Sequence, residues 1–299
     1  MILLQLAILG AGTGALLGLP AVGFGLILRV TRIFHVAHGA VFLLTAETYY
    51  YAVTTWHFGV PLAILACLVV SVGGGILIYL IAYRPLIRGR LSFLVGFVAS
   101  LGVLTVITNV LSIVNGGGFL SFPSGVLTTQ RLSLGGLQIP VGDIVGVVLG
   151  VLIIVGLQLW LSRTLSGRTI RAISDDRDLA AVYSVRTTAH DIVTMAVGSA
   201  LLVPAAIIIP SLNGVDGSAA LTVGTFAFTA TIIGGVTSPV GTFVSAVVLG
   251  IIESVSVQWL PASWSQAVGL GIMVIVLLTR PGGLFSRNAG QSVLAERSS

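Results

Sequence analysis

Residues 91–114 read LSFLVGFVASLGVLTVITNVLSIV, an apolar run without a charged side chain. An α-helix of about 20 apolar residues crosses the hydrocarbon core of a membrane, so this run is long enough to span it. Similar runs, with few charges, recur along the chain at 2–28, 34–54, 60–83, 140–161, 189–211, 219–236, 241–259 and 264–279. The sequence therefore predicts an all-α polytopic membrane protein with about 8–10 transmembrane helices.

The composition excludes an ordinary soluble domain. Only 8% of the residues are charged, whereas soluble domains average about 25%, and the mean hydropathy is +1.11. A transmembrane β-barrel would show alternating segments of about ten residues rather than continuous apolar runs. We therefore expect residues 1–299 to form a single transmembrane domain.

The distribution of positive charge predicts the topology. All 14 basic residues are arginines, and they cluster at 29–32, 84–90, 163–186 and 280–297. The positive-inside rule places these four regions in the cytoplasm. Residues 55–59, 115–139 and 212–218 hold one arginine between them and are expected outside. Nine crossings follow, with the N-terminus outside and the C-terminus inside. We assign the net charge of +5 to topology and expect no nucleic-acid partner.

Glycine and proline predict interruptions in several helices. Segment 2–28 contains Pro20, so we expect it to be kinked or broken. Only TSPVG separates 219–236 from 241–259, so either segment could be re-entrant, which would change the number of crossings. Interrupted segments at 34–54 and 224–245 leave a weak internal repeat possible. The Gly-rich segment 115–139 predicts an external loop with a short hairpin, where a partner protein could dock.

Residues 34–47, FHVAHGAVFLLTAE, place polar groups inside an apolar run. The H-x-x-H spacing lacks the further Cys or Asp ligands of a zinc site, and no nucleophile and base suggest catalysis, so we expect neither a metal site nor an active site. Two interpretations remain for His35 and His38. Either both histidines have a structural role in the bundle interior, near the cytoplasmic interface where an imidazole can stay partly hydrated, or His38 and Gly39 lie near a substrate path.

Other polar residues in the apolar runs are further candidates. Glu47 lies deeper in the membrane, where a carboxylate normally faces the bundle interior, a cavity or a partner subunit. Asp143 lies near an external helix end, where hydration would make its charge inexpensive. The predicted substrate path contains His38, Gly39, Glu47, Asn109, Thr229, Gly234 and Gly235. For Asn109 and Thr229, a hydrogen bond that joins packed helices is the competing interpretation.

The longest segment predicted to be cytoplasmic, 162–188, mixes arginines with aspartates. Arg168, Arg171, Asp175 and Asp178 are three or four residues apart, so in one helix they would share a face. Asp175 or Asp178 could favour the start of a short helix, either by N-capping or through the helix dipole. A short amphipathic helix between two membrane segments suits docking into a partner's groove. A solvated loop that only fixes topology is the alternative.

Several motifs, in order, carry a resemblance to a known family. The stretch GRTIRAISDDRDLAA at 167–181 resembles the coupling loop of branched-chain amino acid ABC transporter permeases, whose pattern is G-R-x-x-R-A-x-x-x-D followed by small residues. AHGAVFLL, AYRPLIRGR with VASLGVLTVITN, FTATIIGGVTSPVGTFVSAVVLGIIE and RPGGLF resemble other family segments in the same order. The resemblance covers about residues 15–286.

The resemblance implies a multi-subunit importer. Two permease subunits, identical or homologous, would form the path across a prokaryotic plasma (inner) membrane, and two cytoplasmic ABC ATPase subunits would drive it. An external solute-binding protein would deliver a branched-chain or related small amino acid, an amide or urea. No phosphate-binding loop G-x-x-x-x-G-K-[ST] is present, so this chain is expected to hold no cofactor and no catalytic site. ATP and Mg would bind to the ATPase subunits.

By the same resemblance, the 167–185 segment is the ATPase-coupling element. The residues expected to contribute are Gly167, Arg168, Arg171, Ala172, Asp175, Asp178, Ala180 and Ala181. The competing function is a stand-alone secondary transporter or channel for a small polar solute, which would need no docking segment. The sequence also departs from the family pattern. Ala40 stands where the family often has Glu, Ser184-Val185-Arg186 replaces a Gly-Ile pair, and the Ser238–Thr242 element is one residue shorter.

Overall fold

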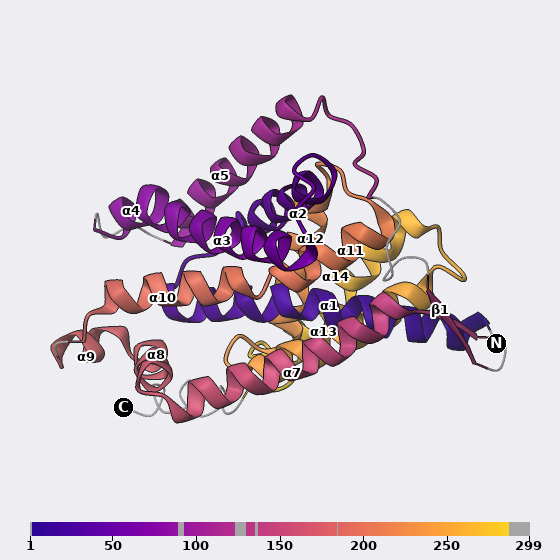
Figure 1. Cartoon of the computed structure of the whole chain (residues 1–299). Coiled ribbons are helices and arrows are strands. Elements are labelled where there is room, and N and C mark those ends of the chain that lie inside the picture. The colour runs from indigo at the N-terminus through magenta and orange to yellow at the C-terminus, as the bar shows by residue number, and fades with distance from the viewer. Residues whose placement is uncertain (1, 89–92, 123–129, 135–136, 184, 287–299) are drawn as a thin grey trace.

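The computed structural model describes residues 2–88, 93–122, 130–134, 137–183 and 185–286, and most of them are helical (Figure 1). The first half contains α1 (Ile2–Thr31), α2 (His38–Thr54), α3 (Val60–Ile78), a π-helical turn η1 (Tyr79–Tyr83), α4 (Arg84–Arg88), α5 (Phe93–Val114), β1 (Arg131–Leu134) and β2 (Leu137–Pro140). The second half contains α7 (Val141–Arg163), α8 (Leu165–Asp175), α9 (Arg177–Val182), α10 (Thr187–Ala200), α11 (Val203–Asn213), α12 (Ala219–Gly234), α13 (Pro239–Ser256), the 3₁₀ turn η2 (Ala262–Trp264) and α14 (Ser265–Thr279).

The all-α polytopic fold class is confirmed. Seven helical stretches of the described chain are long and apolar enough to cross a membrane: Ile2–Thr31, Val60–Leu86, Leu94–Val114, Val141–Arg163, Thr187–Asn213, Pro239–Ser256 and Ala262–Thr279. The apolar runs at 34–54 and 219–236 form the shorter helices α2 and α12, with 17 and 16 residues. At about 1.5 Å per residue each is about 25 Å long, which is shorter than the hydrocarbon core.

Helix interruptions occur at other places than expected. The first segment is not broken, because α1 is one continuous helix with Pro20 inside it. The run at 189–211 is instead divided into α10 and α11 at residues 201–202. The segment after α3 widens into the π turn η1, in which the backbone N–H of Arg84 donates to the carbonyl of Tyr79. Extra-residue turns of this kind often occur at functional positions.

Helix α1 forms the centre of the bundle and packs most extensively against α13 (Figure 1). A Cβ atom added to Gly10 would lie 2.5 Å from the carbonyl oxygen of Gly250, and one added to Gly14 would lie 2.6 Å from that of Ala246. Glycines four residues apart therefore let the two backbones touch, which is how membrane helices associate where no hydrophobic effect drives them together.

Four side chains from other elements donate hydrogen bonds to main-chain carbonyls of α1. His38 Nε2 lies 3.1 Å from the Pro20 oxygen and Thr231 Oγ1 lies 2.8 Å from the Ala21 oxygen. Closer to the two ends of α1, Ser254 Oγ donates to the Leu6 oxygen at 2.8 Å, and Arg177 of α9 donates to the Val30 oxygen at 2.9 Å. Helices α2, α9, α12 and α13 are thereby attached to one backbone.

The two ends of the bundle differ in structure. The antiparallel hairpin β1–β2, which pairs Arg131 with Pro140, lies near the N-terminus of α1, whereas α8 and α9 lie at the opposite end (Figure 1). The short hairpin predicted within 115–139 is therefore present. Residues 123–129 and 135–136 of that segment, Ser184, Arg90 and the arginines at 287 and 297 lie outside the described residues.

Candidate functional site

The two histidines of the 34–47 stretch lie deep in the bundle. His38 contacts α1 at Pro20, 11 residues before α1 ends at Thr31, which is about 16 Å along the helix axis. The segment 32–37 therefore turns back into the bundle, helped by Arg32, which has a left-handed backbone (φ 60°). His35 is 0% and His38 is 1% exposed. The expected position in the bundle interior is confirmed, whereas partial hydration of the imidazoles near the cytoplasmic interface is wrong, because the chain re-enters before α2 begins.

Hydrogen bonds fix the orientation of both imidazoles. The Tyr83 hydroxyl donates to Ser100 Oγ at 2.8 Å, so the His35 Nδ1–H donates to the Tyr83 oxygen at 2.7 Å. His38 uses its Nε2–H for the Pro20 carbonyl. Among the described residues, His35 Nε2 and His38 Nδ1 have no hydrogen-bond partner. Each ring is therefore held through one nitrogen, and no group of three or more metal-binding side chains occurs in the described ranges.

Gly39 marks the tightest contact of the predicted path. A Cβ atom at this position would lie only 1.9 Å from the carbonyl oxygen of Ala220. The first turn of α2 therefore packs directly on the backbone at the start of α12, and both short helices begin at this point. The contact brings the AHG segment next to the helix that carries Thr229, which is 2% exposed.

Glu47 lies on the same helix as His38 but on its opposite side. The nine residues between them correspond to about 13 Å along α2 and half a turn in rotation. Glu47 is 6% exposed, the side chain of Asn115 lies near its carboxyl group, and its Oε2 has no partner among the described residues. Tyr51 donates to Asn115. This group forms a separate polar cluster toward the end of α2.

The other candidates for the path do not join these clusters. Gly234 and Gly235 pack against the start of α13 and the turn after α14, where the Phe285 N–H donates to the Gly234 carbonyl at 3.2 Å. Asn109 donates to the Thr105 carbonyl of its own helix and lies on an exposed face of α5. The structure thus brings His38 and Gly39 near α12 but does not assemble the seven candidates in one place.

The predicted coupling segment is two helices rather than one. Thr164 caps α8 by accepting from the Gly167 N–H at 3.0 Å, and Asp176 caps α9 by accepting from the Leu179 N–H at 2.9 Å. The prediction of capping by Asp175 or Asp178 is wrong, because Asp176 has the extended backbone that a cap requires. Asp178 does lie in the first turn of α9, where its charge favours the helix dipole. The predicted single face is wrong as well, since the break separates Asp178 from α8.

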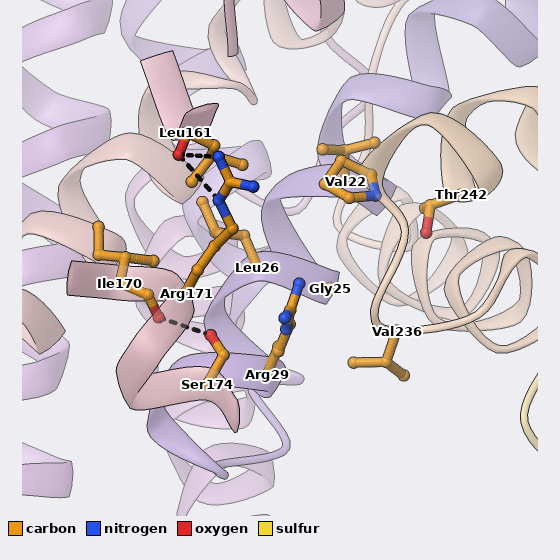
Figure 2. Close-up of a pocket in the computed structure, with 11 residues that line it drawn as sticks. Val22, Gly25, Leu26, Arg29, Leu161, Ile170, Arg171, Ser174, Val236 and Thr242 are labelled. Atoms are coloured by element: carbon orange, nitrogen blue, oxygen red, sulfur yellow. Dashed lines mark hydrogen bonds between the residues drawn. The ribbon is translucent and has the colours of Figure 1, made fainter. Parts of the chain in front are cut away.

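The charged side chains of α8 point in different directions. Arg171 bonds through Nε and its terminal nitrogen to the carbonyl of Leu161 in α7, and Asp175 pairs with Arg29 of α1 at 2.9 Å. Figure 2 shows Arg171 and Arg29 lining the same narrow pocket, about 10 Å³, between α1, α7 and α8. Arg29 also donates to the Thr237 carbonyl at 3.0 Å. These contacts attach α8 directly to α7 and α1, and Arg29 in turn joins α1 to the turn before α13.

The outward surface of α8 and α9 is partly apolar. Four large side chains are strongly exposed: Leu165 (83%), Val182 (79%), Tyr183 (77%) and Leu179 (54%). Of the predicted coupling residues, Arg168, Ala172, Asp178 and Ala181 are also exposed, whereas Gly167 and Ala180 are buried against neighbouring helices. An exposed apolar surface rimmed by charges is typical of a protein interaction site.

Sequence reasoning missed the strongest ionic contact of this region. Arg177 donates to both carboxylate oxygens of Asp191, at 2.9 and 2.7 Å, and Tyr79 donates to the same carboxylate at 2.9 Å. Asp191 is 0% exposed, and its hydrogen bond with Arg177 raises the pKa of the guanidinium. Arg177 also bonds to the Val30 carbonyl. The sequence signal was a lone aspartate in the first two turns of an apolar helix.

Comparison with known proteins gives a consistent result over nearly the whole chain. A family model described as "Branched-chain amino acid transport system / permease component" matches residues 6–277. The high-affinity branched-chain amino acid transport system permease protein BraD of Pseudomonas aeruginosa is 26% identical over 95% of this chain and 96% of its own length. The corresponding permease protein LivH of Escherichia coli K12 is 23% identical over 93% and 94%.

One solved structure shares the fold. PsaBC from Streptococcus pneumoniae, determined in complex with a Fab, has a TM-score of 0.50 and 11% sequence identity, and the match covers 97% of this chain and 94% of that chain. At this identity the likeness concerns the architecture of the helices alone.

Proposed function

Because this chain belongs to the family of branched-chain amino acid transport system permease components, we propose that it carries a branched-chain amino acid across the membrane, driven by separate ATPase subunits that dock on α8 and α9. The protein is a multi-pass permease of the plasma membrane, and its relatives are transport subunits. The proposal adds the substrate, the direction of transport (import) and the docking surface. The chain itself carries no catalytic site in this scheme, and ATP and Mg bind to the ATPase subunits.

The observation that carries the docking proposal is the exposed apolar surface of α8 and α9. Leu165, Leu179, Val182 and Tyr183 lie at the end of the bundle opposite the hairpin, on the segment whose arginines predict a cytoplasmic location. Exposed side chains of this size in two short amphipathic helices suit insertion into a groove of a partner. We assign this surface to the ATPase.

Three contacts supply a route from the docking surface to the membrane helices. Asp175 links α8 to α1 through Arg29, Arg171 links α8 to the end of α7, and Arg177 links α9 to α10 and η1. A displacement of α8 and α9 by the ATPase would therefore move these membrane helices together. Rigid-body movement of packed helices about an interface is an established form of switching.

The remaining partners follow from the family and from the exposed surface. The described parts of α3 and α5 expose many large apolar side chains, among them Ile113 at 81% and Ile81 at 73%. We propose that this surface contacts lipid and a second permease subunit, identical or homologous. An external solute-binding protein would deliver the amino acid at the hairpin end.

The ATPase activity of the assembled complex tests the docking proposal. Complex purified with this chain should hydrolyse ATP faster when the binding protein and leucine are added. Val182→Asp should abolish co-purification of the ATPase, because a charge would be placed inside an apolar groove. The matched control is Val257→Asp, at an exposed valine (42%) directly after α13 at the other end of the bundle. A chain that purifies alone and moves solute without ATP would refute the assignment.

Glu47 offers a test of the substrate path. Glu47→Gln removes the charge but keeps the size of the side chain, so we expect normal insertion and folding with uptake of leucine reduced several-fold. A buried carboxylate in the membrane is energetically costly, and such residues usually mark a functional site. Initial rates of uptake into vesicles measure the effect, and Glu253→Gln is the control. Unchanged kinetics in Glu47→Gln would exclude Glu47 from the path.

A further inference from the structure

A cavity of about 290 Å³ lies at the end of the bundle that carries the hairpin. It is bounded by the first half of α1, the strands β1 and β2, the start of α7 and the end of α11. Its volume is close to the lower limit of small-molecule sites, about 300 Å³. By the positive-inside rule this end faces the outside, so an incoming solute would meet this cavity first.

The hairpin is fixed over the cavity by an unusual contact. The side-chain amide of Gln5 donates to the Gln138 carbonyl at 2.7 Å, and its oxygen accepts from the Gln138 N–H at 3.1 Å. Both hydrogen-bonding groups of one residue in β2 are thereby satisfied by α1. The hairpin places Arg131 opposite Pro140, the residue that precedes α7. One wall of the cavity is therefore a built structure and not a loose loop.

Two opposite charges line the cavity without meeting each other. Arg131 and Asp143 both contribute to its wall, yet neither has a hydrogen bond or ion pair with another described side chain. Asp143 is 6% exposed as a whole residue, and it lines this cavity. Leaving a buried charge without a partner is costly. A ligand with a positive group near Asp143 and a negative group near Arg131 would satisfy both residues.

Glycine makes the position of Asp143 possible. A Cβ atom on Gly12 would lie 2.5 Å from the Asp143 Cβ and 2.8 Å from its carboxyl carbon. The side chain of Asp143 is thus seated against the backbone of α1. An aspartate in the first turn of α7 also favours the helix dipole, but that role requires neither burial against Gly12 nor an unpaired arginine across the same cavity.

The remaining wall is apolar. Leu9 and Leu16 of α1 face the cavity together with Ile209 and Leu212 of α11. Aliphatic side chains of this kind bind an aliphatic group through burial of apolar surface, about 25 cal/mol per Å². The cavity therefore combines one cation, one anion and an aliphatic surface in a space suited to a small molecule.

We propose that this cavity binds a free aliphatic amino acid as a zwitterion, in the permease itself. The α-carboxylate is held by the Arg131 guanidinium, the α-ammonium by the Asp143 carboxylate, and the side chain by the leucine and isoleucine wall. The choice of an aliphatic amino acid rests on the proposed function. The site would receive the ligand on the outer side before it crosses the membrane.

Direct binding of labelled leucine to the purified full-length chain, without binding protein or ATP, tests the site. Wild-type protein should bind saturably. Asp143→Asn and Arg131→Gln should each weaken binding by about tenfold or more, because each removes a charge-assisted contact. Asp216→Asn is the matched control, since that carboxylate is exposed and already accepts from Ser218 at 2.9 Å. Thermal unfolding of each variant verifies that the fold is kept.

Ligand analogues separate the two charges. 4-Methylpentanoate lacks the ammonium group, and isoamylamine lacks the carboxylate. The preference for leucine over 4-methylpentanoate should be lost in Asp143→Asn and kept in Arg131→Gln. The preference over isoamylamine should be lost in Arg131→Gln and kept in Asp143→Asn. Equal effects of either substitution on all three ligands would contradict the assignment of the two groups.

Uptake by the complete transporter, measured in parallel, distinguishes failure of the site from failure of the proposed function. A complex that transports leucine, with a chain that does not bind it or binds it equally in both variants, overturns the site alone. A complex that transports no aliphatic amino acid overturns the proposed function. In that case, leucine binding by the chain that is lost in both variants still supports the site.

Discussion

Replacing Asp191 with asparagine is expected to destabilise the protein and to uncouple ATP hydrolysis from transport. The carboxylate accepts two hydrogen bonds from Arg177 and one from Tyr79 while fully buried. Removing one member of a buried ion pair typically costs about 3–5 kcal/mol, because the other charge is left without compensation. We therefore expect a clearly lower midpoint of thermal unfolding and ATP hydrolysis that no longer responds to leucine.

A second ion pair supplies the control. Asp175 pairs with Arg29 at a similar distance, 2.9 Å, but its side chain is 74% exposed. Exposed pairs contribute about 0–1 kcal/mol, so Asp175→Asn should leave the midpoint nearly unchanged. A double-mutant cycle of Arg177→Gln and Asp191→Asn should show that the two effects are not additive. Additive effects, or equal losses for Asp175→Asn and Asp191→Asn, would contradict the importance given to the buried pair.

Replacing Gly39 with alanine is expected to prevent correct folding. The new Cβ would lie 1.9 Å from a main-chain oxygen, that of Ala220, and a backbone atom at the start of a packed helix cannot rotate away. Overpacking in a core costs about 1–3 kcal/mol when side chains can adjust, and here they cannot. We expect a large loss of folded protein, measured as the monodisperse peak in size-exclusion chromatography.

Two other glycines show whether the effect is specific. Gly73 and Gly102 also lie inside membrane helices, but an added Cβ would meet nothing within 4 Å at either position. Alanine has a higher helix propensity than glycine by about 1 kcal/mol, so Gly73→Ala and Gly102→Ala should give normal or improved yield. A normal yield for Gly39→Ala would show that α2 and α12 can separate without loss of structure.

The fold class was predictable from the sequence because lipid allows few solutions. Each of the nine apolar runs forms helix, since a backbone without water must bond to itself. The lengths of α2 and α12 were less predictable, because an apolar residue that packs in a re-entrant turn looks like one inside a helix. Pro20 suggested an interruption, but α1 continues through it. In a membrane bundle, neighbouring helices make a proline tolerable that would interrupt an isolated helix.

The candidate sites show where sequence reasoning ends. A shared face was predicted from the spacing of Arg168, Arg171, Asp175 and Asp178, which assumed one continuous helix. The helix instead ends at Asp175, and Asp176 caps a new one. Arg177 and Asp191 are 14 residues apart and meet only because α9 and α10 fold back together. The burial of Asp143 depends on a glycine of another helix, Gly12. Long-range contacts of this kind leave no periodic signal along the chain.

The hydrogen bonds that attach four elements to α1 have a consequence for sequence divergence. The acceptors are the main-chain oxygens of Leu6, Pro20, Ala21 and Val30, whereas each donor is a side chain elsewhere. Substituting the acceptor residues leaves every one of these oxygens in place, so alanine scanning of α1 would not detect the bonds. Replacing a donor side chain, that of Ser254, His38, Thr231 or Arg177, is therefore the way to remove one of these bonds by mutation.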